Sequence, residues 1–322
     1  MGKLEDYLGS VSYQRLHEYT AGFSEDNFIV DFQFGKIYRG IIDFVRIKEH
    51  MVVKVWENKD NSNEVQAQNE QLMMDEIFLL QHERMTSQGC MVNLKGYCHE
   101  DNHLAVIYDL ESSDTLHNHL PAGDFTWLHR MKVALQLAHL LKFLHVQHPP
   151  HKPLHIRNLC AANIMLDKDY NPKLFDFSMV CGLIFSSNRQ FYPQQASSVL
   201  GKCAQKTDVF AFGMLLLSLM MKRAVSVEDL KFSAKNNLDC DENDESNEIL
   251  QATKRLKYSL VHESFGLQSY FCASDGPEIT QLAIECVQPP ANGQLSMKDV
   301  VKRLWELEIV QKHDLRDMLK EK

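Results

Sequence analysis

The sequence predicts an α+β fold in two lobes, a β-rich lobe followed by a helical one. Alternating or β-branched runs fill the first hundred residues and suit strands of an antiparallel sheet: "NFIV", "KIYRGII", "MVVKVW" and "HLAVIYDL". From residue 127 onward, apolar residues instead recur every three or four positions, which is the period of a buried helix face. With 322 residues, of which 44% are hydrophobic and 24% charged, the chain is long enough for two such lobes.

One helix is expected among the strands, over residues 64–83. In "EVQAQNEQLMMDEIFLLQHE", Leu72, Leu79 and Leu80 recur at helical spacing. Glu76 falls in the same pattern, so the sequence places a carboxylate beside the apolar face of this helix.

The helical lobe is predicted to contain three prominent helices. The first spans 127–145 and buries one face, made of Met131, Ala134, Leu137, Ala138, Leu141 and Leu144. The apolar run 209–221 follows Asp208 and is shorter than the ~20 residues that a bilayer span needs, so we expect a buried helix. Ser296 and Asp299 resemble a capping box that opens the last helix. Its core stripe is Val300, Val301, Leu304 and Leu307.

These patterns divide the chain into four parts. We expect an N-terminal tail at 1–10, the β-rich lobe at 11–111, the helical lobe at 112–310 and a charged C-terminal helical tail at 311–322. The stretch 239–248 carries six carboxylates in ten residues, whose repulsion favours an exposed insertion in the helical lobe, with partner docking as the alternative.

Charge and cysteine usage narrow the function. The formal charge of −9 argues against a nucleic-acid role, because phosphate contacts need clustered Lys and Arg. Eight cysteines without a CxxC pair indicate reduced thiols in a cytosolic compartment. The four histidines of "HVQHPPHKPLH" have no carboxylate close by in the sequence, so we expect a structural or surface role and no zinc. Gly2 is a candidate site for N-myristoylation, but Asp6 stands where that motif has Ser or Thr.

An ordered set of motifs then makes a family resemblance specific. "FSEDNFIVDFQFGKIYRG", "VVKV", "MVNLKGYC", "FTWLHRMKVA", "FLH", "AANIMLD", "KLFDF" and "TDVFAFGMLLLSLM" occur in this order between about residues 11 and 310. Together they resemble the plant receptor-like cytoplasmic kinases, and a brassikin-like member of that group is one candidate. The resemblance implies the bilobal protein-kinase-like fold.

Several parts of the kinase machinery are retained by resemblance. Lys54 matches the strand lysine that holds the α- and β-phosphates, and Glu76 matches the helix glutamate that pairs with it. Asn163 and Asp176 match the two residues that chelate Mg²⁺, and they stand thirteen residues apart. We also count Asp109 among the nucleotide-binding positions.

Other parts are lost. Asn158 occupies the catalytic-base position, and an amide cannot accept the proton of a substrate hydroxyl. General-base catalysis typically contributes ~10²–10⁴-fold to the rate, and this contribution is lost. Cys160 stands where the family has a lysine. The phosphate-covering loop reads "VDFQFG", so Val30 and Phe32 replace two glycines and only Gly35 remains.

Further departures affect the adenine slot and the activation segment. Val52 replaces the usual small alanine before Lys54 and is expected to crowd the slot. Ser178 replaces the glycine after "DF". Ala196 and Gln294 replace both members of an ion pair that the family buries, and such a joint loss can be nearly neutral.

The sequence alone therefore favours a catalytically inactive pseudokinase. We expect no enzymatic activity and a role as an adaptor or allosteric partner of receptor kinases at the cell surface or in immunity. The alternatives are a weak ATP-dependent Ser/Thr kinase and an ATP-binding switch without turnover. No cofactor is expected to be required, although weak Mg-ATP binding stays open. We expect protein partners, no nucleic acid, no transmembrane segment and a cytoplasmic location, with the inner face of the plasma membrane as a variant.

Overall fold

The computed structural model describes residues 9–44, 47–59, 61–100, 102–146, 153–156, 158–177, 204–226, 229, 259–287 and 295–315. Internal contacts divide the chain into two units. The first holds the described residues up to Leu116 and those from Ala162 to Phe177, and the second holds the others. Each unit is described by itself below.

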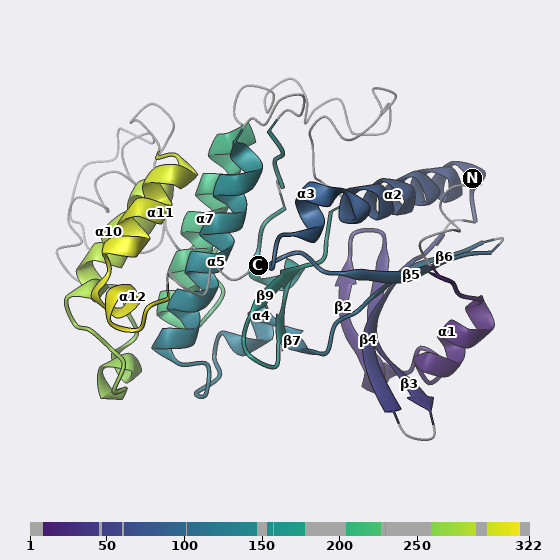
Figure 1. Ribbon diagram of the computed structural model, residues 1–322, viewed down its shortest axis with the longest axis horizontal. Coiled ribbons are helices and arrows are strands. Elements are labelled where there is room, and N and C mark those ends of the chain that lie inside the picture. The colour runs from purple at the N-terminus through teal and green to yellow at the C-terminus, as the bar shows by residue number, and fades with distance from the viewer. Residues whose placement is uncertain are drawn as a thin grey trace. The chain divides into compact units, whose positions relative to one another are not determined.

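The first unit is built on a six-stranded sheet. The strand order is β1-β5-β6-β4-β3-β2, and all neighbours are antiparallel except β1 and β5 (Figure 1). The strands are β1 (Gly9–Ser10), β2 (Phe28–Phe32), β3 (Gly35–Phe44), β4 (Ile47–Trp56), β5 (Leu94–Glu100) and β6 (His103–Tyr108). The four runs that predict strands in the sequence lie on β2, β3, β4 and β6, which confirms them.

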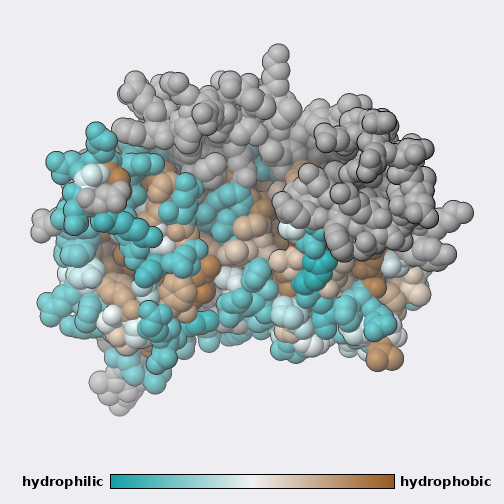
Figure 2. All heavy atoms as spheres, turned by 180° about the vertical axis from the view of Figure 1, so that it is seen from behind, coloured by the Kyte–Doolittle hydropathy of each residue, from teal (hydrophilic) through white to brown (hydrophobic). Residues whose placement is uncertain are grey.

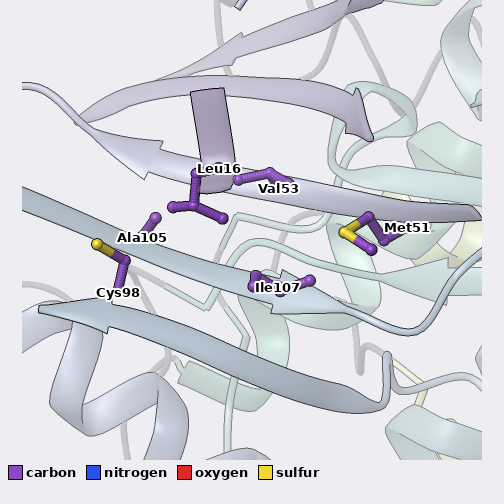
Figure 3. Close-up of a cluster of buried hydrophobic side chains, with 6 residues drawn as sticks. All are labelled: Leu16, Met51, Val53, Cys98, Ala105 and Ile107. Carbon is purple, nitrogen blue, oxygen red and sulfur yellow. The ribbon is translucent and has the colours of Figure 1, made fainter. Parts of the chain in front are cut away.

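The two faces of this sheet carry different helices. The short helix α1 (Tyr13–Tyr19) inserts Leu16 into a fully apolar cluster on one face (Figure 3). The other members of this cluster come from β4, β5 and β6: Met51, Val53, Cys98, Ala105 and Ile107. The opposite face meets α2 (Asn63–Gln81), which confirms the predicted helix and buries Met73, Glu76 and Ile77.

Helix α2 begins and ends at identifiable residues. Ser62 has extended backbone angles and its hydroxyl accepts a hydrogen bond from the Val65 amide, as an N-cap does. His82 ends α2, and its imidazole then accepts from the Arg84 amide to start the four-residue helix α3 (Glu83–Thr86). These caps fix the length of the helix that carries Glu76.

A second, three-stranded sheet completes the first unit. It has the order β7-β8-β9, with β7 (Ser112–Thr115), β8 (Ile164–Asp167) and β9 (Pro172–Leu174). The first unit therefore extends past residue 111, where the sequence places the end of the β-rich lobe, and it also includes residues 162–177. The physical reason is backbone pairing: β7 supplies hydrogen-bonding groups to a strand that lies about fifty residues further along the chain.

The second unit is helical. Its described elements are α4 (Leu116–His119), α5 (Trp127–His145), α7 (Ala204–Met221), η3 (Glu263–Leu267), α10 (Asp275–Val287), α11 (Met297–Glu306) and α12 (Glu308–Lys312). In Figure 1, α5 and α7 run side by side, with α10 and α11 beside them. Gly213 of α7 permits a close approach to α10, because a Cβ there would lie 2.7 Å from the Cβ of Cys286.

The helix patterns in the sequence hold in this unit. Every residue predicted for the apolar face of α5 is buried. Helix α7 is buried along the run 209–221 at Val209, Phe212 and Leu216, as predicted. The capping box of α11 is present in both directions between Ser296 and Asp299, and these bonds lower the pKa of the Asp299 carboxyl.

On the face in Figure 2, hydrophilic residues surround smaller groups of hydrophobic ones. Among the residues that the structure describes, the exposed large hydrophobic ones are Ile41, Phe78, Val146, Leu267 and Tyr270. No helix within the described ranges is long and apolar enough to cross a bilayer. The tail at 1–8, the acidic stretch 239–248 and residues 316–322 lie outside the described residues.

Candidate active site

Strand alternation places the key lysine on the α2 face of the sheet. Side chains of a strand alternate between its two faces. Met51 and Val53 of β4 belong to the α1 cluster, so Val52 and Lys54 face the other way. On β6, Tyr108 lies opposite Val52, so it shares that face. The sheet thus presents Lys54 and Tyr108 to the helix that carries Glu76.

Lys54 lies at the centre of a buried cluster of charges. Its Nζ donates a 2.7 Å hydrogen bond to Oε2 of Glu76 and lies 3.6 Å from Oδ1 of Asp176. Nζ also donates to the carbonyl of Phe175 at 3.3 Å. Lys54 is 0% exposed, Glu76 3% and Asp176 4%, so these charges interact with little solvent screening. The structure therefore brings together three residues that the sequence assigns to phosphate and metal binding.

Tyr108 is a site residue that the sequence analysis did not identify. Its hydroxyl donates to Oε1 of Glu76 and is 3.2 Å from the Phe175 carbonyl. Burial raises the pKa of Glu76, while Lys54 and the Tyr108 hydroxyl oppose that rise. Burial also raises the pKa of Tyr108 well above its usual value, so it remains a hydrogen-bond donor. The sequence offered one signal for Tyr108: it ends the predicted strand directly before Asp109, which the sequence analysis counts among the nucleotide-binding positions.

Phe32 covers the ammonium group from the side of the hairpin β2–β3. The Phe32 ring centre lies 4.6 Å from the Nζ of Lys54, and the Trp56 ring centre lies 4.9 Å from it. The two rings meet edge to face, with centres 5.7 Å apart. Lys54 is thus enclosed by two carboxylates, one carbonyl and two aromatic rings.

Gly35 makes this aromatic contact possible. It pairs with Phe32 on one side and with Trp56 on the other. A Cβ at Gly35 would lie 1.9 Å from the Val55 carbonyl oxygen, so no other residue fits without moving the strands. The remaining glycine of the "VDFQFG" segment therefore has a packing reason that is independent of any ligand.

Three more of the predicted nucleotide-binding positions are Val30, Val52 and Asp109. The first two lie on strands, and Asp109 directly follows a strand. Val30 is half-buried on β2 opposite Ile37, and Val52 is 1% exposed on β4. Asp109 follows β6 and its carboxylate lies 3.7 Å from the Nζ of Lys95, with a largely exposed side chain. Val52 is therefore part of the lining beside Lys54, while Asp109 forms a surface ion pair.

The hairpin β8–β9 explains the thirteen-residue spacing between Asn163 and Asp176. Asn163 comes directly before β8, and Asp176 follows β9 by two residues. Ile164 pairs with Leu174, so the two candidate metal ligands lie at the same end of this ladder. One amide and one carboxylate oxygen form a donor set that suits Mg²⁺. At the other end, Asp167 accepts from the amides of Asp169 and Asn171 and closes the turn.

The second unit holds the catalytic-base position. Asn158 is half-buried, Cys160 is exposed, and the preceding Ile156 amide donates to Oδ2 of Asp208 at 3.0 Å. This bond fixes the backbone two residues before Asn158. Ser178, Ala196 and Gln294, which the sequence analysis discussed, lie outside the described residues.

Sequence comparison identifies the class of protein. Residues 26–263 match the family profile described as "Protein tyrosine and serine/threonine kinase". This match covers well over half of the chain. The chain belongs to the protein kinase family, and the β-rich and helical lobes of its fold are those of a protein kinase.

Plant kinases are among the relatives of this chain. The chain is 25% identical to the "Probable serine/threonine-protein kinase PBL28" of Arabidopsis thaliana, over 92% of this chain and 79% of that protein. It is 32% identical to the "Proline-rich receptor-like protein kinase PERK12" of the same plant, over 66% of this chain. The chain spans only 29% of that receptor's length, and about a third to a half of two further receptor kinases.

One solved structure illustrates the fold. The pseudokinase domain of BIR2, described as an immune regulator of the RLK/Pelle family, has a TM-score of 0.60 and 19% identity. The match covers 94% of this chain and 85% of that one. At this identity, the similarity supports the bilobal fold alone.

These findings correct one expectation from the sequence. The prediction that the chain is not an enzyme is wrong at the level of its family. The matched profile describes protein tyrosine and serine/threonine kinases. Three relatives that the chain matches over 75% to 79% of their length are named serine/threonine-protein kinases. The losses at Asn158 and Cys160 were given too much weight. Phosphoryl transfer depends chiefly on positioning and charge stabilisation, and the charged residues Lys54, Glu76 and Asp176 are assembled.

Proposed function

We propose that this protein is an ATP-dependent serine/threonine protein kinase of low intrinsic activity. The observation that supports this most is the buried cluster in which Lys54 contacts both Glu76 and Asp176. Burying these charges is costly unless they are paired, and a cluster with no role in charge binding could be replaced by apolar residues at little cost. A site for the phosphates of a nucleotide gives this arrangement a use.

Each residue then has a defined task. Lys54 binds the α- and β-phosphate oxygens, and Glu76 holds its ammonium in place, with Tyr108 fixing the other oxygen of Glu76. Asp176 and Asn163 are the residues that would hold Mg²⁺. A bound Mg²⁺ neutralises negative charge on the phosphates during transfer. These tasks need positioned charges and no covalent step by the protein.

The proposed rate is low because a general base is missing. Asn158 orients a substrate hydroxyl through its amide but takes no proton from it. The missing base costs typically ~10²–10⁴-fold. Cys160, in place of a cation, leaves further transition-state charge unbalanced. A reduced but measurable transfer is what these two changes together support.

Nucleotide binding also requires Phe32 to move. Lys54 is fully buried: Glu76, Asp176 and the Phe175 carbonyl lie around its ammonium, and the Phe32 and Trp56 rings cover it. A phosphate oxygen therefore reaches the ammonium only after the Phe32 ring leaves its position against Trp56. We propose that this closed arrangement alternates with an open, nucleotide-binding one.

We further propose that the protein acts in signalling beside receptor-like kinases, on the cytoplasmic side of the plasma membrane. Its relatives include receptor kinases whose matched segments cover 66% to 70% of this chain. In vivo cross-linking in native tissue, followed by mass spectrometry, tests this. Recovery of receptor-like kinases supports it, and their absence from efficiently cross-linked samples contradicts it.

The activity is tested with purified protein and labelled ATP in the presence of Mg²⁺ or Mn²⁺. We expect slow incorporation into the protein itself or into a generic Ser/Thr substrate. Lys54→Met and Asp176→Asn should abolish it, whereas Lys48→Met, at an exposed lysine on the same strand, should not. Identical labelling by all four proteins points to a contaminating kinase. No labelling by the unmodified protein, in an assay sensitive to the slowest known kinases, contradicts the proposal.

A further inference from the structure

A second buried cluster lies within the helical unit. It consists of His145 at the end of α5, His155 in the segment 153–156, and Asp208 near the start of α7. One ligand atom from each lies within 4.8 Å of the other two. Asp208 is 0% exposed, and the side chains of His145 and His155 are 9% and 14% exposed.

The backbone brings the two histidines together. The Leu154 amide donates to the Leu144 carbonyl at 2.9 Å, and this bond sets the next residue of each segment side by side. As a result, the rings of His145 and His155 have centres 5.0 Å apart. The sequence around the histidines contains no nearby carboxylate, and the fold supplies one from Asp208.

One ring nitrogen of each histidine faces the same carboxylate oxygen of Asp208. Nε2 of His145 lies 2.9 Å from Oδ2 of Asp208, and Nδ1 of His155 lies 3.7 Å from it. Within the described residues, Nδ1 of His155 is buried and makes no hydrogen bond. A buried imidazole nitrogen without a partner costs free energy, and a metal ion would satisfy it.

We propose that His145, His155 and Asp208 form a binding site for a divalent transition metal, with Zn²⁺ as the best match. Two imidazole nitrogens and one carboxylate oxygen are a ligand set that zinc accepts, with water in the fourth position. Zinc bonds of about 2.0–2.2 Å place tetrahedral ligands about 3.3 Å apart. The observed separations of 2.9 Å and 3.7 Å lie on either side of that value.

Binding requires a tautomer change in His145 and small shifts of the ligand atoms toward tetrahedral spacing. Its Nε2 must present a lone pair to the metal, so its proton resides on Nδ1. Oδ2 of Asp208 binds the metal with one lone pair and keeps the Ile156 amide on the other. The metal would therefore clamp the segment 153–156, which leads to Asn158, onto α7 and α5. It would stabilise the folded protein by linkage.

The test uses the full-length protein after removal of metals with a chelator. Zn²⁺ is titrated in competition with a chromogenic indicator, and Co²⁺ serves as a spectroscopic probe. We expect one Zn²⁺ per chain, a higher melting temperature with Zn²⁺, and tetrahedral Co²⁺ absorption without a thiolate charge-transfer band. The last point excludes the cysteines, of which Cys160 is exposed.

Variants locate the site. His155→Gln and His145→Asn should each weaken Zn²⁺ binding by roughly tenfold or more. His117→Gln, at an exposed histidine of the same unit, and the double variant His148→Gln/His151→Gln should leave it unchanged. Circular dichroism establishes that each variant is folded, and two ligand variants keep the test usable if one is not. Unchanged binding in both ligand variants, dependence on His148 and His151, or no stoichiometric binding by the unmodified protein would overturn the proposal.

Discussion

The ammonium of Lys54 lies 4.6 Å from the centre of the Phe32 ring. By resemblance, Phe32 stands where the kinase family carries a glycine. The ring is 9% exposed and Lys54 is 0% exposed, so Phe32 shields the lysine from solvent. A phosphate and this ring compete for the same approach to Nζ. This competition connects the packing of the hairpin to nucleotide affinity.

Phe32→Gly should therefore tighten ATP binding. Burial of a phenylalanine side chain is worth about 1.5–3 kcal/mol, and the closed form gives that up when ATP binds. We expect the Kd for Mg-ATP to fall roughly tenfold or more, as measured by calorimetry. Ile41→Gly, at an exposed hydrophobic residue further along β3, is the control and should change the Kd little. Equal affinities of Phe32→Gly and the unmodified protein would show that the ring does not block the site.

Tyr108→Phe should destabilise the first unit. The change removes the hydroxyl that donates to the buried Glu76, and leaves one carboxylate oxygen without that donor. We expect a loss of about 1–3 kcal/mol in unfolding free energy, measured by urea titration. Tyr97→Phe, at another buried tyrosine on the neighbouring strand β5, should cost less. A similar cost for both variants would argue against a special role for Tyr108.

Arg130→Met should destabilise the helical unit strongly. Arg130 is 0% exposed, and its guanidinium donates to the backbone carbonyls of Phe125, Leu219 and Leu120 at 2.7–3.0 Å. Burial lowers its pKa to about 9. Methionine satisfies none of these carbonyls, so we expect a loss of roughly 3 kcal/mol or more, seen in thermal or chemical denaturation. Lys298→Met, at an exposed position on α11, should stay within about 0.5 kcal/mol.

His139 should make stability depend on pH. Burial, and secondarily Lys142, lowers its pKa to about 4 from a usual 6.5, and its ring lies 5.2 Å from that of Trp305. The unfolded chain therefore binds the proton more readily than the folded one. Its contribution to stability is complete above pH 6.5 and decreases as the pH falls toward about 4.

His139→Gln should reduce that decrease, by on the order of 1–2 kcal/mol once partial solvent contact is considered. The unfolding free energy is measured at intervals between pH 7 and 4. His117→Gln, at an exposed histidine of the same unit, should keep the pH profile of the unmodified protein. Superimposable profiles for the unmodified protein and His139→Gln would contradict this assignment.

Elements with a strong local pattern were predictable. Strand β4 alternates between two faces, helix α5 repeats its apolar residues at helical spacing, and the box between Ser296 and Asp299 marks the start of α11. Strand β7 was not predictable, since Ser112–Thr115 is polar and becomes a strand through pairing with β8. Local propensity carries no information about a partner that lies fifty residues away.

The candidate active site shows the same division. The resemblance of their motifs to those of kinases identified Lys54, Glu76, Asn163 and Asp176 in the sequence. How much each departure from the kinase motifs lowers the activity did not follow from the residue types. The departures at Asn158, Cys160 and the glycine loop suggested an inactive protein, whereas the family match and the assembled cluster around Lys54 point to a kinase.

By itself, the sequence determined the α+β class and the main helices and strands, because these depend on periodicity along the chain. Its resemblance to kinase motifs identified the charged residues of the kinase cluster. Only the tertiary structure decided that Phe32 covers Lys54, that Tyr108 binds Glu76, and that Asp208 meets His145 and His155. Each of those contacts joins segments far apart in sequence. Their formation depends on sheet register and helix packing, which bring together side chains that no local pattern connects.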